Sequence, residues 1–169
     1  DFSYTGIAQN DYGKWTVVDG KLKQTLTGFV KFAGNWYNLK KGKLVENYTG
    51  LLKNDYGWWY VNGGVLDRTY TGLAKNSYGW WYVKNGTIDF TFNGIGTNEW
   101  GDWRVVNGKL DKTTTGFVKA GTSWYIFTQG KVNTRVTGLA KNEYGWWYIN
   151  SGKLDTSFTG VARNQYGLW

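Results

Sequence analysis

Histidine, cysteine, methionine and proline are all absent from this 169-residue sequence. The lack of cysteine excludes disulfides, thiolate zinc sites and cysteine nucleophiles. The lack of histidine excludes the serine–histidine triad, histidine metal sites and histidine general bases. No stretch reaches the roughly 18 uninterrupted apolar residues of a membrane helix, and no signal-peptide pattern begins at residue 1. We therefore expect no membrane insertion, no metal and no cofactor.

Aromatic residues and glycine are abundant instead. Trp, Tyr and Phe make up 20 % of the chain, with 12 Trp among them, and there are 25 glycines. This aromatic content is inconsistent with a disordered chain. The 20 basic residues outnumber 12 acidic ones, which gives a net charge of +8 and a pI near 9.5. The charge permits anionic partners such as acidic polysaccharide or nucleic acid, and it also aids solubility.

Glycine recurs with a strict period of 22 residues. One set keeps this spacing without exception: Gly6, Gly28, Gly50, Gly72, Gly94, Gly116, Gly138 and Gly160. A segment of 22 residues is too small to fold alone, so it must stack on its neighbours to bury its apolar face. The period predicts a single repeat array over residues 1–169, with repeats that start near residues 6, 28, 50, 72, 94, 116, 138 and 160. We expect the array to be a fragment of a longer protein.

Each repeat has the pattern of a β-hairpin. β-Branched and aromatic residues alternate with glycine turns, as in Trp81-Tyr82-Val83 followed by Asn85-Gly86. Asn and Gly tolerate the positive φ that a tight hairpin turn requires. No repeat shows the i, i+3, i+4 spacing of an amphipathic helix. We predict an all-β fold, a solenoid-like stack of seven to eight 22-residue β-hairpin repeats.

One face of the expected strands is apolar in every repeat. Successive side chains of a strand point to opposite faces. The second position of the Trp pair is always aromatic, as in Trp59 and Trp81, and the residue two further on is always apolar, as in Val61 and Val83. The next strand adds Leu66 and its equivalents. We predict that this face, including the second aromatic, is buried between repeats.

The opposite face varies from repeat to repeat. Its first position is Trp in five repeats but Lys14, Asp102 and Leu168 in the others. A position that accepts Lys or Asp is unlike deep core, and exposed large aromatics mark binding surfaces. The candidate ligand contacts on this face are Trp58, Tyr60, Trp80, Tyr82, Trp146, Tyr148, Trp36 and Trp124. Alternatively, these Trp residues only seal the groove between adjacent repeats.

A further aromatic stands two residues before the first Trp position, beside a glycine. These turn aromatics are Tyr56, Tyr78, Trp100, Tyr144 and Tyr166. They either wall the same cleft or pack on the neighbouring repeat, and we include Tyr56, Tyr78 and Tyr144 among the candidate ligand contacts. If ligands bind between consecutive repeats, the junction of the repeats that start at Gly50 and Gly72 is the best equipped, because both contain Trp-Trp-Tyr.

An aromatic cleft suits sugar rings, quaternary ammonium groups held by cation–π attraction, and stacked nucleobases. Polar residues near the turns offer hydrogen bonds to a sugar, and turn chemistry is the alternative explanation that we favour for the Asn set. These residues are Asn54, Asn76, Asn142, Asp67 and Asp89.

Charged residues also recur in register. A basic column is formed by Lys31, Lys53, Lys75, Lys119, Lys141 and Arg163. It either follows an anionic polymer or is a solvated stripe that protects sheet edges, and we favour the second interpretation. Carboxylates recur once per repeat, whereas a glycosidase needs one special pair. We therefore expect no catalysis.

The string Thr-Gly, then Lys-Asn-x-Tyr-Gly-Trp-Trp-Tyr-Val, then Asn-Gly-x-Leu-Asp, then Tyr-Thr-Gly resembles the cell-wall-binding repeat superfamily of Gram-positive surface proteins. That superfamily includes choline-binding repeats, glucan-binding repeats and the repeats of large clostridial toxins. The resemblance covers the whole chain and implies a β-hairpin solenoid, export, and attachment to wall polymer or glycan. Choline-binding repeats usually place Trp directly after Thr-Gly, where this chain has residues such as Leu51 and Leu73. One wall of a choline cage is therefore missing.

Together these features predict a non-catalytic module that binds a carbohydrate or cell-wall polymer. It would anchor or target an exported protein, secreted or at the cell surface of a Gram-positive bacterium. Choline stays an alternative ligand, and nucleic acid is not expected as a partner. The alternative function is a structural spacer or a protein-binding adhesin without a small ligand.

Overall fold

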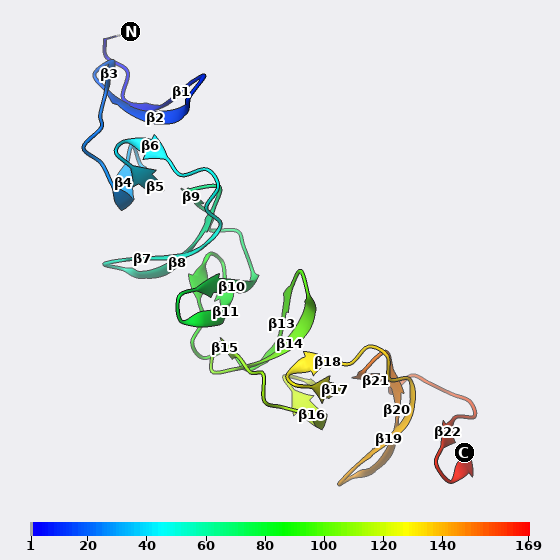
Figure 1. Ribbon diagram of the computed structural model, residues 1–169. Helices are drawn as coiled ribbons and strands as arrows, with labels where there is room; N and C mark the ends of the chain where they lie inside the picture. Colours follow the sequence, from blue (N-terminus) through cyan, green and yellow to red (C-terminus); the bar gives the residue numbers. More distant parts are fainter. Residues whose placement is uncertain (1) are drawn as a thin grey trace. The chain divides into compact units, whose positions relative to one another are not determined.

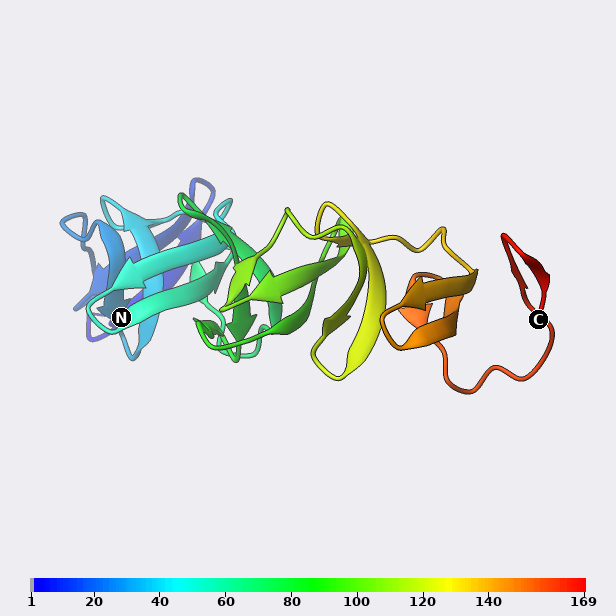
Figure 2. The same cartoon turned by 90° about the horizontal axis from the view of Figure 1, so that it is seen from below.

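Every element in residues 2–169, the part of the chain that the computed structural model describes, is a β-strand (Figures 1 and 2). Seven repeats contribute three strands each, always in the same order. The first strands are β1 (Gly6–Asn10), β4 (Gly28–Phe32), β7 (Gly50–Asn54), β10 (Gly72–Asn76), β13 (Gly94–Asn98), β16 (Gly116–Ala120) and β19 (Gly138–Asn142). The second strands are β2 (Gly13–Val18), β5 (Asn35–Lys40), β8 (Gly57–Asn62), β11 (Gly79–Lys84), β14 (Gly101–Val106), β17 (Ser123–Thr128) and β20 (Gly145–Asn150). The third strands are β3 (Lys21–Leu22), β6 (Lys43–Leu44), β9 (Val65–Leu66), β12 (Thr87–Ile88), β15 (Lys109–Leu110), β18 (Lys131–Val132) and β21 (Lys153–Leu154).

A partial eighth repeat adds β22 (Arg163–Asn164) and β23 (Gly167–Leu168), which pair as a small hairpin near the C-terminus. The prediction of an all-β stack of 22-residue hairpin repeats is confirmed. None of the elements in residues 2–169 is a helix that could span a membrane.

The tight turn between the second and third strands has the backbone that its sequence predicts. Asn85 and Gly86 both have positive φ, at 51° and 78°. Two consecutive positive φ values define a type I′ turn, which suits the twist of a hairpin. Gly86 is also required for space, because a Cβ there would lie 2.4 Å from the carbonyl oxygen of Asp67 in the preceding repeat.

Consecutive repeats are joined by backbone hydrogen bonds between strands. Trp59 of β8 lies opposite Thr87 of β12 in the next repeat, and the N–H of Tyr60 donates to the carbonyl of Gly86 at 2.7 Å. Repeats further along pair in the same way, as Trp103 of β14 does with Lys131 of β18. The second strand of one repeat is therefore the template for the third strand of the next.

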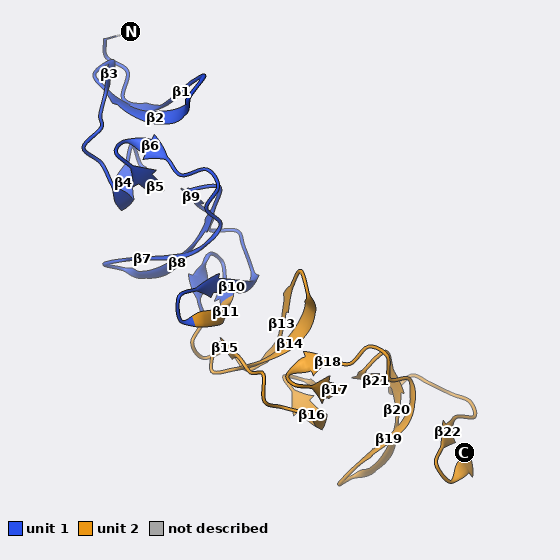
Figure 3. Cartoon of the chain, viewed as in Figure 1, with its two compact units in different colours: residues 1–78, 83–88 blue, residues 79–82, 89–169 orange. Residues whose placement is uncertain are grey.

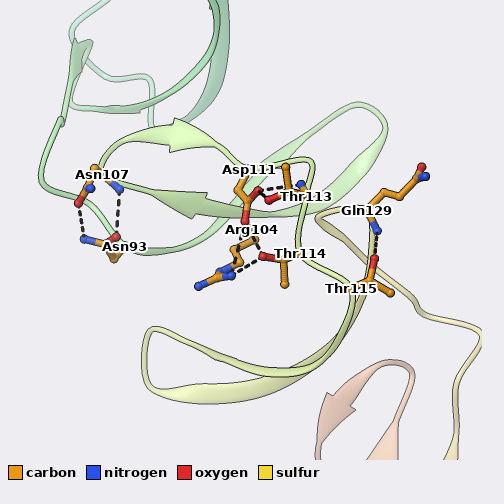
Figure 4. Close-up of polar contacts among 8 residues, drawn as sticks. All are labelled: Asn93, Arg104, Asn107, Asp111, Thr113, Thr114, Thr115 and Gln129. Atoms are coloured by element: carbon orange, nitrogen blue, oxygen red, sulfur yellow. Dashed lines mark hydrogen bonds and ion pairs between the residues drawn. The ribbon is translucent and has the colours of Figure 1, made fainter.

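The Thr of the Thr-Gly motif also holds a turn in place. The Thr115 hydroxyl accepts a hydrogen bond of 3.0 Å from the N–H of Gln129, 14 residues later (Figure 4). Asn93 takes the place of Thr in its repeat, and its side-chain oxygen accepts from the N–H of Asn107 at 3.0 Å. The motif therefore links the start of each first strand to the turn of its own repeat.

Contacts divide the chain into two compact units, residues up to 78 with 83–88, and residues 79–82 with 89–169 (Figure 3). In the first unit, β2, β5 and β8 each pair with the third strand of the following repeat. In the second, residues of β11, β14 and β17 do the same. Each unit is by itself a stack of hairpins held by the same pairing.

The core of each stack follows the apolar face that the sequence predicts. The residues two positions after the second aromatic are all buried: Val17, Leu39, Val61, Val83, Val105, Phe127 and Ile149. In the second unit, Phe127 packs with Ala120 and Val132, and Ile95 of the preceding repeat lies against this cluster. The third strand is less uniform, since Ile88 is buried but Leu22 is 54 % exposed.

The prediction that the second aromatic is also buried is wrong. In the seven complete repeats this residue is half-buried, as Trp59 and Trp81 are, and Trp169 is 67 % exposed. The reason is the short third strand of the next repeat, which lies over the ring with its first residue. That residue is Lys in four of the six such pairings within the described chain, so an aliphatic stem and an ammonium cover the ring rather than apolar core.

Candidate functional site

The first-position Trp of one repeat packs edge-on against the turn aromatic of the following repeat. We call these contacts the junction pairs. Their ring centroids are 5.3 to 6.2 Å apart and their planes lie at 76° to 90°. The five junction pairs are Trp36–Tyr56, Trp58–Tyr78, Trp80–Trp100, Trp124–Tyr144 and Trp146–Tyr166. T-shaped contacts at this distance are favourable for aromatic rings.

The junction pairs lie at the surface. The turn Tyr residues of these pairs are 69 to 78 % exposed, Trp100 is 56 % exposed and Trp146 is 38 % exposed. The other first-position Trp residues are half-buried. Of the predicted candidates, the structure therefore brings Trp36 to Tyr56, Trp58 to Tyr78 and Trp124 to Tyr144 across repeat boundaries. Trp80 and Trp146 meet aromatics that were outside the candidate set.

A correlation within the repeats marks these pairs in the sequence. The two members are 20 residues apart, and wherever the first position is not aromatic the second is not aromatic either. Lys14 corresponds to Gly34, and Asp102 corresponds to Thr122. Reading each repeat alone misses this rule, because the contact joins two repeats.

The Tyr of Trp-Trp-Tyr has a different neighbour. Tyr60 stacks on Tyr70 with ring centroids 3.8 Å apart, and Tyr82 stacks on Phe92 at 3.6 Å. Tyr148 stacks on Phe158 at 3.6 Å in the same way. The exposure predicted for this face is therefore absent at Tyr60, which is 9 % exposed, and only partial at Tyr82 and Tyr148. These stacked rings hold the hairpin to the segment that leads into the next repeat.

Arg104 replaces that Tyr in the repeat that starts at Gly94, and its partners change to match. Its guanidinium lies 3.5 Å from the carboxylate of Asp111 and donates to the hydroxyl of Thr114 (Figure 4). Thr113 and Thr114 donate their hydroxyls to Asp111 at 2.6 and 2.5 Å. Burial raises the pKa of Asp111, but these hydrogen bonds and the Arg104 charge outweigh it and lower the pKa to about 2. A polar cluster here does the packing that stacked rings do elsewhere.

A cation lies over the ring of the second aromatic in five repeats. Lys131 Nζ is 5.7 Å from the centroid of Trp103, and Lys109 Nζ is 5.4 Å from that of Trp81. Further such contacts are Lys43 over Trp15, Lys153 over Tyr125 and Arg68 over Trp59. The Lys contacts follow from the strand pairing, which sets each Lys opposite an aromatic 28 residues earlier. The sequence analysis did not identify this relationship.

The basic column lies beside the junction pairs. Lys31, Lys53, Lys119 and Lys141 are exposed and directly opposite the first-position Trp of their own hairpins. Directly opposite residues of an antiparallel pair share a face with Cβ atoms about 5 Å apart. The first-position Trp residues are therefore flanked by positive charge.

The Asn and Asp residues near the turns serve the backbone. The side-chain oxygen of Asn54 accepts hydrogen bonds from the N–H of Tyr56 and from the indole of Trp59, both at 2.9 Å. Asp67 accepts from the N–H and hydroxyl of Thr69 at 2.8 and 2.6 Å, and these bonds lower its pKa. The favoured interpretation of the Asn set as turn chemistry is thus confirmed at Asn54. Within residues 2–169, no group of three or more acidic side chains is placed to hold a metal ion.

The fold and its recurring aromatic junctions define a class of protein, an all-β array of short repeats with surface aromatics at each junction. Seven segments match the choline-binding repeat, at residues 3–23, 26–45, 47–67, 69–89, 91–111, 113–133 and 135–155. The chain belongs to the choline-binding repeat family. Repeats of this family bind the choline of cell-wall teichoic acids, occur on surface proteins of Gram-positive bacteria and are typically non-catalytic.

Several solved structures are similar. Choline-binding protein F from Streptococcus pneumoniae is 22 % identical, with 98 % of this chain and 57 % of that one covered and a TM-score of 0.34. CbpJ from Streptococcus pneumoniae is 20 % identical over 93 % of this chain and 62 % of its own, with a TM-score of 0.31. The chain thus spans less than two thirds of either protein. No curated protein sequence is similar enough to count as a relative.

Proposed function

We propose that this array is a non-catalytic module that binds a carbohydrate or cell-wall polymer and so anchors or targets an exported protein. The observation that carries the proposal is the set of five junction pairs, each a T-shaped aromatic contact at the surface between consecutive repeats. Exposed large aromatics that recur at one place in every repeat are a binding surface rather than scattered apolar residues.

The geometry of a junction pair suits a sugar ring. Two rings at 76° to 90° form an open corner, which offers one aromatic face to the C–H face of a pyranose and a second aromatic edge beside it. The regular spacing suits a polymer. A long chain can occupy several junctions at once, so that weak sites add to strong retention.

The charges around the junctions argue for a neutral or anionic ligand over choline. A choline site needs aromatic faces that are free to surround a quaternary ammonium. Here the chain's own cations lie over second-position rings such as Trp81 and Trp103. Exposed Lys53 and Lys141 flank the first-position rings of Trp58 and Trp146. Each of these charges repels an added cation.

Two single substitutions test the proposal. Trp58→Ala and Trp80→Ala each remove one half of a junction pair, and we expect both to weaken retention on insoluble wall polysaccharide while the far-UV spectrum and melting temperature change little. Tyr12→Ala is the matched control. Tyr12 is a turn aromatic of the same kind and is 77 % exposed, but the position 20 residues earlier lies before the first residue.

The outcomes separate the candidate functions. Reduced retention in both Trp variants with normal retention of Tyr12→Ala supports the proposal. Normal retention in all three, or no retention of the parent chain on any wall fraction or glycan, supports the alternative of a spacer or protein-binding adhesin. Displacement of the parent chain by free choline at low concentration would establish choline as the ligand instead.

A further inference from the structure

One junction differs from the other four. Between the repeats that start at Gly72 and Gly94, the turn aromatic is Trp100 where the other four junction pairs have Tyr. Its ring centroid is 5.3 Å from that of Trp80, the shortest distance among the junction pairs. Trp100 is 56 % exposed, against 69 to 78 % for the Tyr residues. This junction is therefore the most enclosed of the five.

A cavity of about 380 Å³ opens at this junction. Three indoles line it, from Trp80, Trp100 and Trp103, together with Asn98. The side-chain oxygen of Asn98 accepts hydrogen bonds from the indole of Trp103 at 3.1 Å and from the N–H of Trp100 at 3.0 Å. Because that oxygen is used internally, the amide Nδ2 is the part of Asn98 that can donate to a ligand.

The charge of the cavity is positive. Lys112 and Lys131 line it, and Lys131 Nζ is 5.7 Å from the centroid of Trp103. Of the described residues, none that line the cavity carries a carboxylate. The nearby carboxylates have other partners, since Asp102 accepts a 2.6 Å hydrogen bond from Thr97 and Asp111 is held by Arg104 and two threonines.

We propose that this cavity binds an anionic sugar residue of a polysaccharide, with a carboxylate or phosphate on the ring. The inference rests on the proposed function and names the ligand class of one of its sites. The indoles of Trp80 and Trp100 take the C–H face of the ring, and the ammonium groups of Lys112 and Lys131 take the anion. Asn98 Nδ2 donates to a ring hydroxyl.

The alternative ligands fit the cavity less well. A quaternary ammonium would lie within an aromatic enclosure that already contains two lysines, and like charges in a half-enclosed site repel strongly. A neutral sugar would use the indoles but leave both ammonium groups without a partner. An anionic sugar satisfies the apolar and the charged parts of the wall together.

The test uses the whole chain and intrinsic Trp fluorescence or titration calorimetry. The probes are a glucuronate-containing oligosaccharide, its neutral glucose counterpart, a sugar-phosphate polymer and free choline. For the parent chain we expect the anionic probes to bind about tenfold more tightly than the neutral one, which is 1.4 kcal/mol. The glucuronate and phosphate probes separate the two sources of the charge.

The variants are ones that the other repeats already tolerate. Thr87 occupies the position equivalent to Lys131, and Thr134 the position equivalent to Lys112. We expect Lys112→Thr/Lys131→Thr to bind anionic and neutral probes equally. Lys109→Thr is the matched control, because Lys109 covers Trp81 in the same way and does not line this cavity.

Failure of the inference can be told from failure of the proposed function. If anionic and neutral probes bind the parent chain equally and Trp80→Ala weakens both, the inference is overturned and glycan binding stands. If the double Lys variant retains the preference for anionic probes, the assignment of Lys112 and Lys131 is overturned. If no saccharide binds, or choline binds in preference, both proposals are overturned.

Discussion

The repeats that start at Gly50 and at Gly94 have the same strands and turns but different side chains on one face. The first has Trp58 and Tyr60, and the second has Asp102 and Arg104 at the equivalent positions. Both bury the next inward residue, Val61 at 0 % and Val105 at 1 % exposure. The comparison separates positions that build the stack, which do not vary, from positions that can be exchanged between an aromatic site and a polar surface.

The largest effect should come from the positions that the two repeats share. Gly64 and Gly108 have φ of 79° and 72°, and a Cβ at either would lie 2.6 or 2.3 Å from a carbonyl oxygen of the preceding repeat. We expect Gly64→Ala and Gly108→Ala each to cost about 3 kcal/mol or more, measured as a loss of denaturation midpoint. Gly57→Ala is the control, because its φ is +132° but a Cβ there meets nothing within 4 Å. A much smaller cost in one of the two repeats would break the comparison.

The next effect is confined to the repeat with the polar cluster. The pKa of Asp111 is about 2 in the folded chain, below its ordinary value of 3.8, so its carboxylate stabilises the fold. A lowered pKa contributes stability above the unfolded value, and that stability is lost as the pH falls through the folded value. We expect Asp111→Asn to lower stability by roughly 2 kcal/mol at pH 7, and the difference from the parent chain to shrink between about pH 4 and 2.

Asp67 provides the contrast in the repeat with stacked rings. Its pKa is lowered chiefly by the hydrogen bond from Thr69, without a guanidinium beside it. Asn133 already occupies the equivalent position in another repeat, so Asn is compatible with the turn. Asp67→Asn should therefore change the pH dependence less than Asp111→Asn. Equal pH profiles for the two variants would show that Arg104 adds nothing.

A double substitution should convert the second kind of junction into the first. Asp102→Trp with Thr122→Tyr supplies both members of a junction pair where neither is present. We expect retention on wall polysaccharide to rise by about twofold, as one site is added to five that act together. Each single variant should gain little, because one ring alone lacks its partner. Gain from Asp102→Trp alone would mean that removal of a charge, and not the pair, causes the effect.

Interactions within one repeat could be predicted from the sequence, and interactions between repeats could not. The alternation of strand side chains identified Val61 as core, and Asn85-Gly86 identified the positive-φ turn. The neighbours of Trp59 and Trp58 depend on how one hairpin pairs with the next, and no local pattern gives that register. For this reason the sequence placed Trp59 in the core, where the structure has Arg68 over a half-buried ring. The rule of 20 residues between junction partners was present in the sequence but needed the register to be noticed.

The smallest effect concerns the cations over the second aromatics. Lys43 Nζ lies 5.6 Å from the ring centroid of Trp15, and both residues are at least partly exposed. An exposed cation–π contact contributes about 0.5 to 1 kcal/mol, and removal of the Lys stem also uncovers the ring. We expect Lys43→Thr to lower stability by about 0.5 to 1 kcal/mol, and Lys43→Met to recover the part that comes from the stem. Thr87 lies opposite Trp59 in the natural sequence, so the backbone pairing tolerates Thr at this position. A full cost in Lys43→Met would assign the contact to charge, and no cost in either variant would show that the ring needs no cover.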